Sequence, residues 1–357
     1  MVPPYVVDSF RTTDAAADTT PAETRTMKKG MISVVVCTYN QEQTIGRTLD
    51  AILSQQCHVP YEIVIGEDCS TDGTRTICQQ YAQRHPDKIQ LICNERNKGL
   101  IDNYFDCLLT CQGEYIADCA GDDFWTDTQK LEKEVCVMER HPEVTMVITN
   151  WQYYDERTKK ATPSQQRNHK PVTPGHELLK DIITQYNMSV FHLCTALYRN
   201  EVFRRAYEED ESLFRGPSRC SEDMQIAFTM ALHGDIAYLP DITLNYSIGR
   251  ETISSSADDA KQFWFVRKNT ELIHDLSSKH HIDIGDFYQK QIFALGMHAF
   301  RAHQPQLYQE TLACEAEWNV KRTVKNQLLF YVMSYEWLWK MGLMVRLAVV
   351  SVKRVCR

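Results

Sequence analysis

The chain has 357 residues, of which 43% are hydrophobic and 24% are charged, and its formal net charge is −8 at pH 7. This length allows one large domain or two, and the composition is ordinary for a globular protein. The negative charge argues against nucleic acid as the main partner, because nucleic-acid-binding domains are usually basic.

The first 30 residues predict a flexible extension, since they are rich in Thr, Ala, Asp and Pro. They open on Met1-Val-Pro-Pro, which lacks the apolar stretch of a secretory signal. The 13 cysteines are odd in number and scattered, and no CxxC pair is matched by a second pair. We therefore expect a cytoplasmic protein with free thiols and no structural zinc site.

Strand and helix patterns alternate from residue 32 to residue 148. Short β-branched and apolar runs predict five strands, at Ile32–Val36, Ile63–Ile65, Ile89–Ile92, Tyr115–Ala117 and Val144–Ile148. Apolar residues at helical spacing predict helices between them, beginning near residues 45, 72 and 100. This alternation predicts an α/β fold with βαβ crossovers and a mainly parallel sheet, which binds ligands beyond the carboxyl ends of its strands.

Two acidic pairs fall at the carboxyl ends of predicted strands. Glu67-Asp68 follows the second strand, and Asp122-Asp123 follows the fourth. Adjacent carboxylates repel each other, and a divalent cation relieves the repulsion; Mg2+ or Mn2+ carrying a phosphate suits such oxygen ligands. The alternative for the second pair is an acidic cap on a helix that begins near Thr126. Two acidic pairs on one rim favour the metal site.

Four segments in this order and spacing resemble the family 2 glycosyltransferases. They are Ser33–Asn40 (SVVVCTYN), Glu62–Thr74 (EIVIGEDCSTDGT), Asn94–Asn103 (NERNKGLIDN) and Gly113–Asp123 (GEYIADCAGDD). The resemblance covers about residues 31–250 and implies an inverting enzyme with the GT-A fold, a Rossmann-like and mainly parallel sheet flanked by helices. The chain departs from the family pattern at Cys37, where proline is common, and at Glu67, where aspartate is common; neither change removes the carboxylate of Asp68.

The resemblance assigns roles in the donor site. Asp68 would bind the nucleoside, with Glu67 as its neighbour, and a uracil ring N–H would suit it as hydrogen-bond donor where a cytosine would not. Asp122 would contact the ribose or the donor sugar and is a second candidate ligand of the metal. Asp123 would ligate Mg2+ or Mn2+, which neutralises charge on the leaving nucleoside diphosphate.

Three further residues are candidates for the donor site. Tyr39, at the end of the first predicted strand, is placed to stack on or flank the base. Gly99 is expected first to let the chain turn into a helix, with a part in the donor site as a second role. Arg250, in residues 245–254, resembles part of the segment that closes over the donor and would pair with a phosphate; a solvated surface arginine is the alternative.

The acceptor half needs a base, because inverting transfer requires a group to take the proton from the acceptor hydroxyl. Ser221-Glu-Asp matches the family's position for this base, so Asp223 is the candidate, with Glu222 orienting it or binding acceptor. Capping of a helix by this segment is compatible with that role. His192 and Trp125 are acceptor candidates; a satisfied core histidine and simple packing are the respective alternatives.

The rest of the chain predicts a polar loop and a helical region. Residues 155–170 are mostly polar and predict a loop over the cleft, and helical patterns run from Asp258 almost to the end. Residues 321–357 hold eight lysines and arginines and one acidic residue, an asymmetry typical of contact with an anionic membrane. An apolar stripe from Leu328 to Val350 is too interrupted by charges to span a bilayer, so it is either a core-packed helix or an amphipathic helix in the interface.

The sequence thus predicts an extension (1–30), a GT-A catalytic domain (31–256) with a nucleotide-binding half (31–123) and an acceptor half (124–256), and a C-terminal helical region (257–357). The expected function is inverting transfer of a sugar from a nucleotide-sugar donor, a UDP-sugar first, to a hydroxyl of a glycan or lipid-linked acceptor in cell-surface polysaccharide biosynthesis. The protein would work in the cytoplasm, peripheral on the inner face of the plasma membrane, in an oligomeric state that stays open.

Two alternatives belong to other functional classes. A sugar-phosphate nucleotidyltransferase would normally show a Gly-rich, basic loop after the first strand, and this chain has Thr38-Tyr-Asn-Gln-Glu42 there. A non-catalytic nucleotide- or glycan-binding module is disfavoured by the four intact carboxylates of Asp68, Asp122, Asp123 and Asp223.

Overall fold

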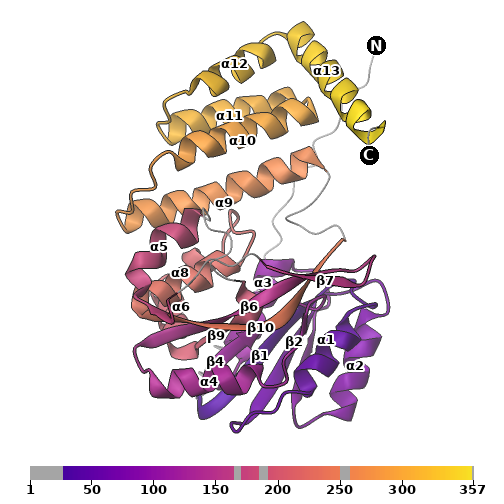
Figure 1. Cartoon of the computed structure of the whole chain (residues 1–357), viewed down its shortest axis with the longest axis vertical. Helices are drawn as coiled ribbons and strands as arrows, with labels where there is room; N and C mark the ends of the chain where they lie inside the picture. Colours follow the sequence, from indigo (N-terminus) through magenta and orange to yellow (C-terminus); the bar gives the residue numbers. More distant parts are fainter. Residues whose placement is uncertain (1–26, 165–169, 185–191, 250–257, 356–357) are drawn as a thin grey trace, which may run out of the picture.

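Ten strands form one continuous sheet in the computed structural model, which describes residues 27–164, 170–184, 192–249 and 258–355 (Figure 1). The strands are β1 (Lys28–Thr38), β2 (Tyr61–Glu67), β3 (Ile89–Cys93), β4 (Gly113–Asp118), β5 (Phe124–Trp125), β6 (Val144–Asp155), β7 (Lys160–Pro163), β8 (Val172–Thr173), β9 (Ala196–Arg199) and β10 (Asp235–Ile248). Their order is β3-β2-β1-β4-β9-β6-β10-β5, with β7 beside β6 and β8 beside β10.

The sheet is mainly parallel, as predicted. Strand β1 runs parallel to β2 and β4, β2 runs parallel to β3, and β6 runs parallel to β10. Strand β9 is inserted between β4 and β6 and is antiparallel to both. The α/β fold is confirmed, and β9 is an addition that the strand patterns did not predict.

Alternate residues of the central strands enter two different cores, which explains their unbroken apolar runs. In β1, Val34 and Val36 pack in one core and Val35 packs in the other. All three side chains are at most 2% exposed. A strand covered on both faces needs apolar residues at every position rather than at every second one.

Helices cover both faces of the sheet. Those of the sheet domain are α1 (Ile45–Leu53), α2 (Thr74–Arg84), α3 (Leu100–Thr110), α4 (Lys130–Arg140), α5 (Gly175–Thr184), α6 (Asn200–Glu209), α7 (Glu211–Phe214) and α8 (Asp223–His233), with a 3-10 turn at Leu193–Thr195. Residues of α1, α2 and α4 pack in one core, and residues of α3, α5, α6 and α8 pack in the other.

A stack of helices follows the sheet domain, as the sequence predicted. It consists of α9 (Asp259–Lys279), α10 (Phe287–Ala302), α11 (Pro305–Glu317), α12 (Val324–Met333) and α13 (Glu336–Val355). Helix α9 lies against the sheet domain, and α12 and α13 are the layer farthest from it (Figure 1). Within the described residues, no helix has both the length and the hydropathy that a membrane crossing requires.

Three local predictions differ from the structure. Strand β1 begins at Lys28, inside the segment assigned to the N-terminal extension, and residues 1–26 lie outside the described part. Residues 160–163 form β7, paired with β6, where a loop was predicted. The C-terminal apolar stripe is not one face, because it is divided between α12 and α13: Leu328 is 62% exposed and Trp339 is 2% exposed.

Candidate active site

The predicted acidic rim lies at the carboxyl ends of β1, β2 and β4. In the parallel register Thr38 of β1 is opposite Glu67 of β2, and Val35 of β1 is opposite Asp118 of β4. The segments that follow these strands therefore leave the sheet at the same edge, as expected for parallel neighbours.

Asp68 follows β2, and its side chain organises the loop before α3. Its Oδ1 accepts hydrogen bonds from Asn94 Nδ2 at 2.9 Å and the Lys98 backbone N–H at 2.8 Å, and its Oδ2 accepts from the Gly99 N–H at 2.9 Å. Gly99 has a φ of 84°, which side chains with a Cβ rarely adopt, so glycine suits this turn. Three of the carboxylate's roughly four acceptor positions are filled.

Glu67 and Tyr39 lie in opposite environments. Glu67 is fully buried, and its carboxylate accepts from the Ser70 backbone N–H at 2.6 Å and pairs with the Arg75 guanidinium. Those contacts fix the turn after β2 and leave Glu67 no exposed surface. Tyr39 directly follows β1 and is 46% exposed, so its ring is available to a ligand.

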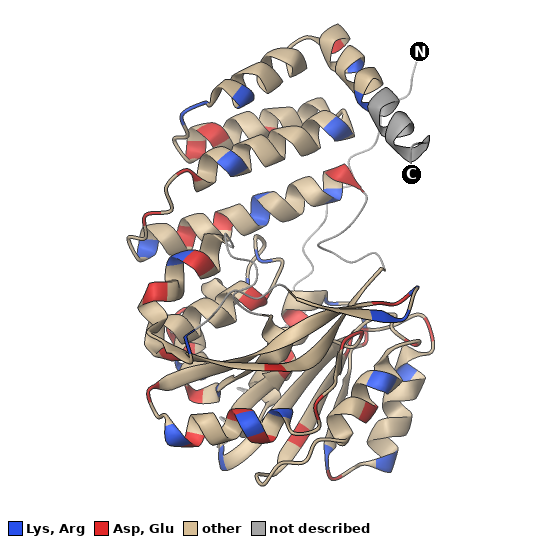
Figure 2. Cartoon of the chain, viewed as in Figure 1, with Lys and Arg blue, Asp and Glu red and all other residues tan. Residues whose placement is uncertain are grey.

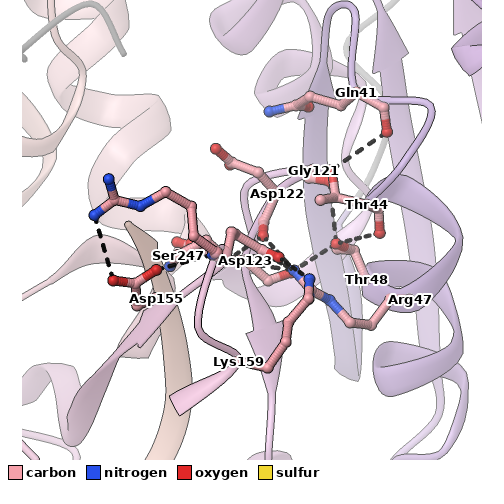
Figure 3. A network of polar contacts seen from close by, with 12 residues as sticks. Gln41, Thr44, Arg47, Thr48, Gly121, Asp122, Asp123, Asp155, Lys159 and Ser247 are labelled. Atoms are coloured by element: carbon pink, nitrogen blue, oxygen red, sulfur yellow. Dashed lines mark hydrogen bonds and ion pairs between the residues drawn. The ribbon is translucent and has the colours of Figure 1, made fainter. Parts of the chain in front are cut away.

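The Asp122-Asp123 loop is held by two elements that are distant in the sequence (Figure 3). Thr48 Oγ1 of α1 donates to the Asp123 carbonyl oxygen at 2.6 Å, and Ser247 Oγ of β10 donates to the Asp122 carbonyl oxygen at 2.6 Å. The Ser247 backbone N–H donates to Asp123 Oδ1 at 2.8 Å. The Asp122 side chain is half-buried and in Figure 3 points away from the contacts that its own backbone makes.

Arg47 is a part of this site that sequence reasoning missed. Its guanidinium donates to the Asp122 carbonyl oxygen at 3.0 Å, pairs with Glu156 at 2.7 Å and lies 3.9 Å from the centre of the Phe124 ring. Ser247 was also missed as a contact of the acidic pair. Neither residue carries a local sequence signal, because each reaches the loop across 75 or more positions of the chain.

Asp123 has the surroundings of a metal ligand. Its side chain is 1% exposed, and Oδ2 has no hydrogen-bond partner of normal length among the described residues. Burial, and next the charge of Asp122, raise the pKa of this carboxyl well above its usual range. A divalent cation would supply the partner that Oδ2 lacks and offset the cost of the buried charge, so the residues present fit such an ion.

His192 and Cys194 lie beside Asp123, and their ligand atoms and a carboxylate oxygen of Asp123 are within 4.8 Å of one another. Burial lowers the pKa of His192 to about 4, so its imidazole is neutral, and Nδ1 has no hydrogen-bond partner among the described residues. Burial raises the pKa of the Cys194 thiol well above its usual range. The neutral imidazole is therefore the readier second ligand, because metals bind the thiolate form of cysteine.

The remaining donor and acceptor candidates are placed as follows. Trp125 is 4% exposed, its indole N–H donates to the Cys194 carbonyl oxygen at 3.1 Å, and Lys130 Nζ lies 4.6 Å from its ring centre. Its ring therefore offers almost no face to a ligand, and packing accounts for it. His192 contacts the Tyr246 ring at 4.4 Å between centres. Arg250 lies outside the described residues.

Asp223 is the first residue of α8, with Glu222 immediately before the helix. Burial raises the pKa of Asp223 to about 6. Burial, and next the charge of Asp223, raise the pKa of Glu222 well above its usual range. A pKa of about 6 leaves Asp223 mostly ionised at neutral pH, which is the state that a general base needs, while burial and the charge of Asp223 favour the protonated form of Glu222.

Asp118 is a third carboxyl near this pair, and sequence reasoning missed it. It ends β4, and burial raises its pKa to about 7, with a further raising effect from the charge of Asp223. The hydroxyls of Tyr104 and Tyr198, which are bonded to each other at 2.9 Å, lower that pKa only in part. The sequence signal that could have identified Asp118 is its position as an aspartate directly after the apolar run of a buried strand.

Replacing Asp118 with Asn is expected to stabilise the fold at pH 8, by on the order of 4 kcal/mol. The folded-state pKa is about 7 against 3.8 for the free side chain, so the wild-type protein loses stability as the pH rises between these values. The gain should be full above about pH 7 and vanish near pH 4. Melting temperatures across this range measure it, and a variant less stable than wild type at pH 8 would contradict the assignment.

Comparison with known proteins decides the family. Residues 33–206 match the family model described as "Glycosyl transferase family 2". The chain contains a family 2 glycosyltransferase domain. This confirms the family that the four motifs indicated and favours glycosyltransferase chemistry over the nucleotidyltransferase alternative.

Relatives agree with this assignment, and one solved structure shares the fold. An uncharacterized protein of Mycobacterium tuberculosis is 31% identical over 238 residues, 66% of this chain and 64% of that protein, so the match leaves over a third of the relative uncovered. Bacillus subtilis TuaG, named as a glycosyltransferase of teichuronic acid biosynthesis, is 28% identical over 250 residues, 69% of this chain and 90% of TuaG. The structure of residues 1–349 of Staphylococcus aureus TarS in complex with UDP-GlcNAc has the same fold, with a TM-score of 0.52, 16% identity and coverage of 87% of this chain and 92% of that one.

Proposed function

We propose that this glycosyltransferase domain moves a sugar from a nucleotide-sugar donor, a UDP-sugar first, to a hydroxyl of a glycan or lipid-linked acceptor, with inversion at the anomeric carbon. The observation that carries the proposal is a pair of carboxyls with different properties, whose charges both add to the effect of burial in raising the pKa of the Cys194 thiol. Asp123 has a buried oxygen that lacks a partner, and burial raises the pKa of Asp223 to about 6. The first suits a cation and the second suits a base.

The donor would bind across the ends of β1, β2 and β4. Asp68 keeps about one acceptor position beyond those used by Asn94, Lys98 and Gly99, and a uracil imide N–H would fill it. Tyr39 is exposed beside it and would flank the base. Asp122 would turn to the ribose or the donor sugar.

Mg2+ or Mn2+ would be held by Asp123, with Asp122 close by and His192 Nδ1 as a further metal ligand. An imidazole in the ligand set favours Mn2+ over Mg2+, since Mg2+ prefers oxygen ligands alone. When bound, the ion supplies positive charge against the negative charge that develops on the nucleoside diphosphate. Ser247 orients Asp123 through the hydrogen bond to Oδ1, which leaves Oδ2 for the ion.

The protonation states of Asp223 and Glu222 would set how the sugar is transferred. Asp223 takes the proton from the acceptor hydroxyl as its oxygen forms a bond to the anomeric carbon, and the bond from that carbon to the diphosphate oxygen breaks. Glu222, whose protonated form is favoured by burial and by the charge of Asp223, would position Asp223 or the acceptor through a hydrogen bond. The likeness to TuaG supports cell-surface polysaccharide assembly as the setting.

The nucleotide is tested by thermal unfolding with Mn2+ and a panel of nucleotides. UDP should raise the melting temperature, because a ligand that binds only the folded protein stabilises it by an amount that grows with the ratio of its concentration to its Kd. CDP should raise it much less, because cytosine has no ring N–H for Asp68. A larger shift with CDP or GDP than with UDP would overturn the choice of uridine, and no shift with any nucleotide would overturn the donor site itself.

A further inference from the structure

The outermost layer of the helical stack carries an unusual concentration of exposed apolar side chains. Eight of the fourteen large hydrophobic residues that are exposed among those described fall within α12, α13 and the turn between them. They are Val324, Leu328, Tyr331, Tyr335, Trp337, Met341, Met344 and Val345, here called the apolar end face.

The packing of the helical stack does not use these side chains, because other residues of α12 and α13 fill its interior. Helix α12 buries Phe330 and Met333 on its inner side, and α13 buries Trp339, whose indole N–H donates to the Phe300 carbonyl oxygen at 2.8 Å. On the outer side of α13, Trp337, Met341 and Met344 repeat at intervals of four and three residues, so they share one face. Stacked helices usually end in a layer whose outer face is polar, and this one does not.

Basic residues border the apolar end face. Lys321, Lys325, Lys340 and Arg346 are exposed, and Glu336, the one acidic residue of this segment, pairs with Lys340 at 3.1 Å. Figure 2 shows Lys and Arg along α12 and α13 and many acidic residues on the sheet domain. Because the whole chain has a net charge of −8, this layer is the end that an anionic surface would attract.

We propose that the apolar end face docks on an anionic membrane surface, with α12 and α13 lying in the headgroup region rather than crossing the bilayer. Tryptophan, tyrosine and methionine between lysines and arginines are the composition of interfacial helices, in which aromatic rings sit at headgroup level and cations meet lipid phosphates. A second copy is the poorer occupant, because a two-fold contact would place the same lysines opposite one another. The proposal does not depend on the identity of the donor or acceptor.

The test is co-sedimentation of the full chain with vesicles of phosphatidylcholine alone and with added phosphatidylglycerol. The wild-type protein should bind the anionic vesicles, and binding should weaken as salt screens the charges. Trp337→Ser should lower the vesicle partition coefficient about tenfold. A Lys325→Glu/Lys340→Glu variant should lower it about 25-fold or more at low salt, at roughly fivefold for each lysine lost.

Matched controls keep the result specific. Trp264 on α9 is 41% exposed and lies outside the apolar end face, so Trp264→Ser should bind vesicles as wild type does. Trp337 is 64% exposed, so its variant should fold with an unchanged melting temperature. Absence of binding to anionic vesicles at low salt, or equal losses for the two tryptophan variants, would overturn the proposal. A wild-type dimer that Trp337→Ser dissociates, without vesicle binding, would assign the face to a second copy instead.

Discussion

Replacing Asp223 with Asn is expected to lower the rate of sugar transfer by about 10²–10⁴-fold while leaving donor and metal binding intact. The amide keeps the size of the side chain at the start of α8 but cannot accept the acceptor proton. Turnover measured with donor and acceptor, together with donor affinity by calorimetry in the presence of Mn2+, separates the chemical step from binding.

Glu222→Gln is the matched control for this change. Because burial and the charge of Asp223 raise the pKa of Glu222 well above its usual range, its neutral form is favoured and an amide imitates that form. The loss of rate should therefore be far smaller than for Asp223→Asn. Near-normal transfer by Asp223→Asn, or an equal loss in both variants, would show that Asp223 is not the base.

The pH dependence of transfer follows from the Asp223 carboxyl. A base acts in its ionised form, so kcat/KM should fall as the pH drops below the Asp223 pKa of about 6, by about tenfold per pH unit. The residual activity of Asp223→Asn should lack this acid limb. A wild-type profile that is flat from pH 7 to pH 5 would contradict the assignment.

Replacing Asp123 with Asn is expected to change metal affinity and stability in opposite directions. Mn2+ affinity should fall by about 100-fold or more, because the buried Oδ2 is lost as an anionic ligand. Without metal the variant should be more stable than wild type at pH 7. The raised pKa of Asp123 means that its ionised form is unfavourable in the folded state, and the amide keeps the acceptor for the Ser247 N–H. Mn2+ titration by electron paramagnetic resonance and melting temperatures without metal measure both effects.

Asp127→Asn is the control for the effects of Asp123→Asn on Mn2+ affinity and on stability. Asp127 pairs with Lys133 at 2.7 Å, and its pKa is lowered by that lysine, against the raising effect of burial. Its replacement should lower stability slightly and leave Mn2+ binding unchanged. His192→Gln should weaken Mn2+ binding less than Asp123→Asn does. Wild-type Mn2+ affinity in Asp123→Asn would remove this residue from the metal site.

The parallel core and its acidic rim could be predicted because they depend on local patterns. A strand buried on both faces reads as an unbroken apolar run, and the residues that follow such strands meet at one edge, so position alone predicted that the pairs Glu67-Asp68 and Asp122-Asp123 lie there. Strand β9 escaped prediction because it has only four residues, Ala196–Arg199, in an irregular region. The pairing of Ser247 with Asp123 joins residues 124 positions apart, a contact that no periodicity encodes.

The late position of β9 has a consequence for synthesis of the chain on the ribosome. Strand β4 can pair with β1 once both strands have been synthesised, but its other edge is covered only by β9, which comes about 80 residues later. During that interval the nascent protein presents an open strand edge next to apolar side chains, the feature that chaperones recognise and that promotes aggregation. The yield of active protein should therefore respond to translation speed between β4 and β9 more than to speed over the C-terminal helices.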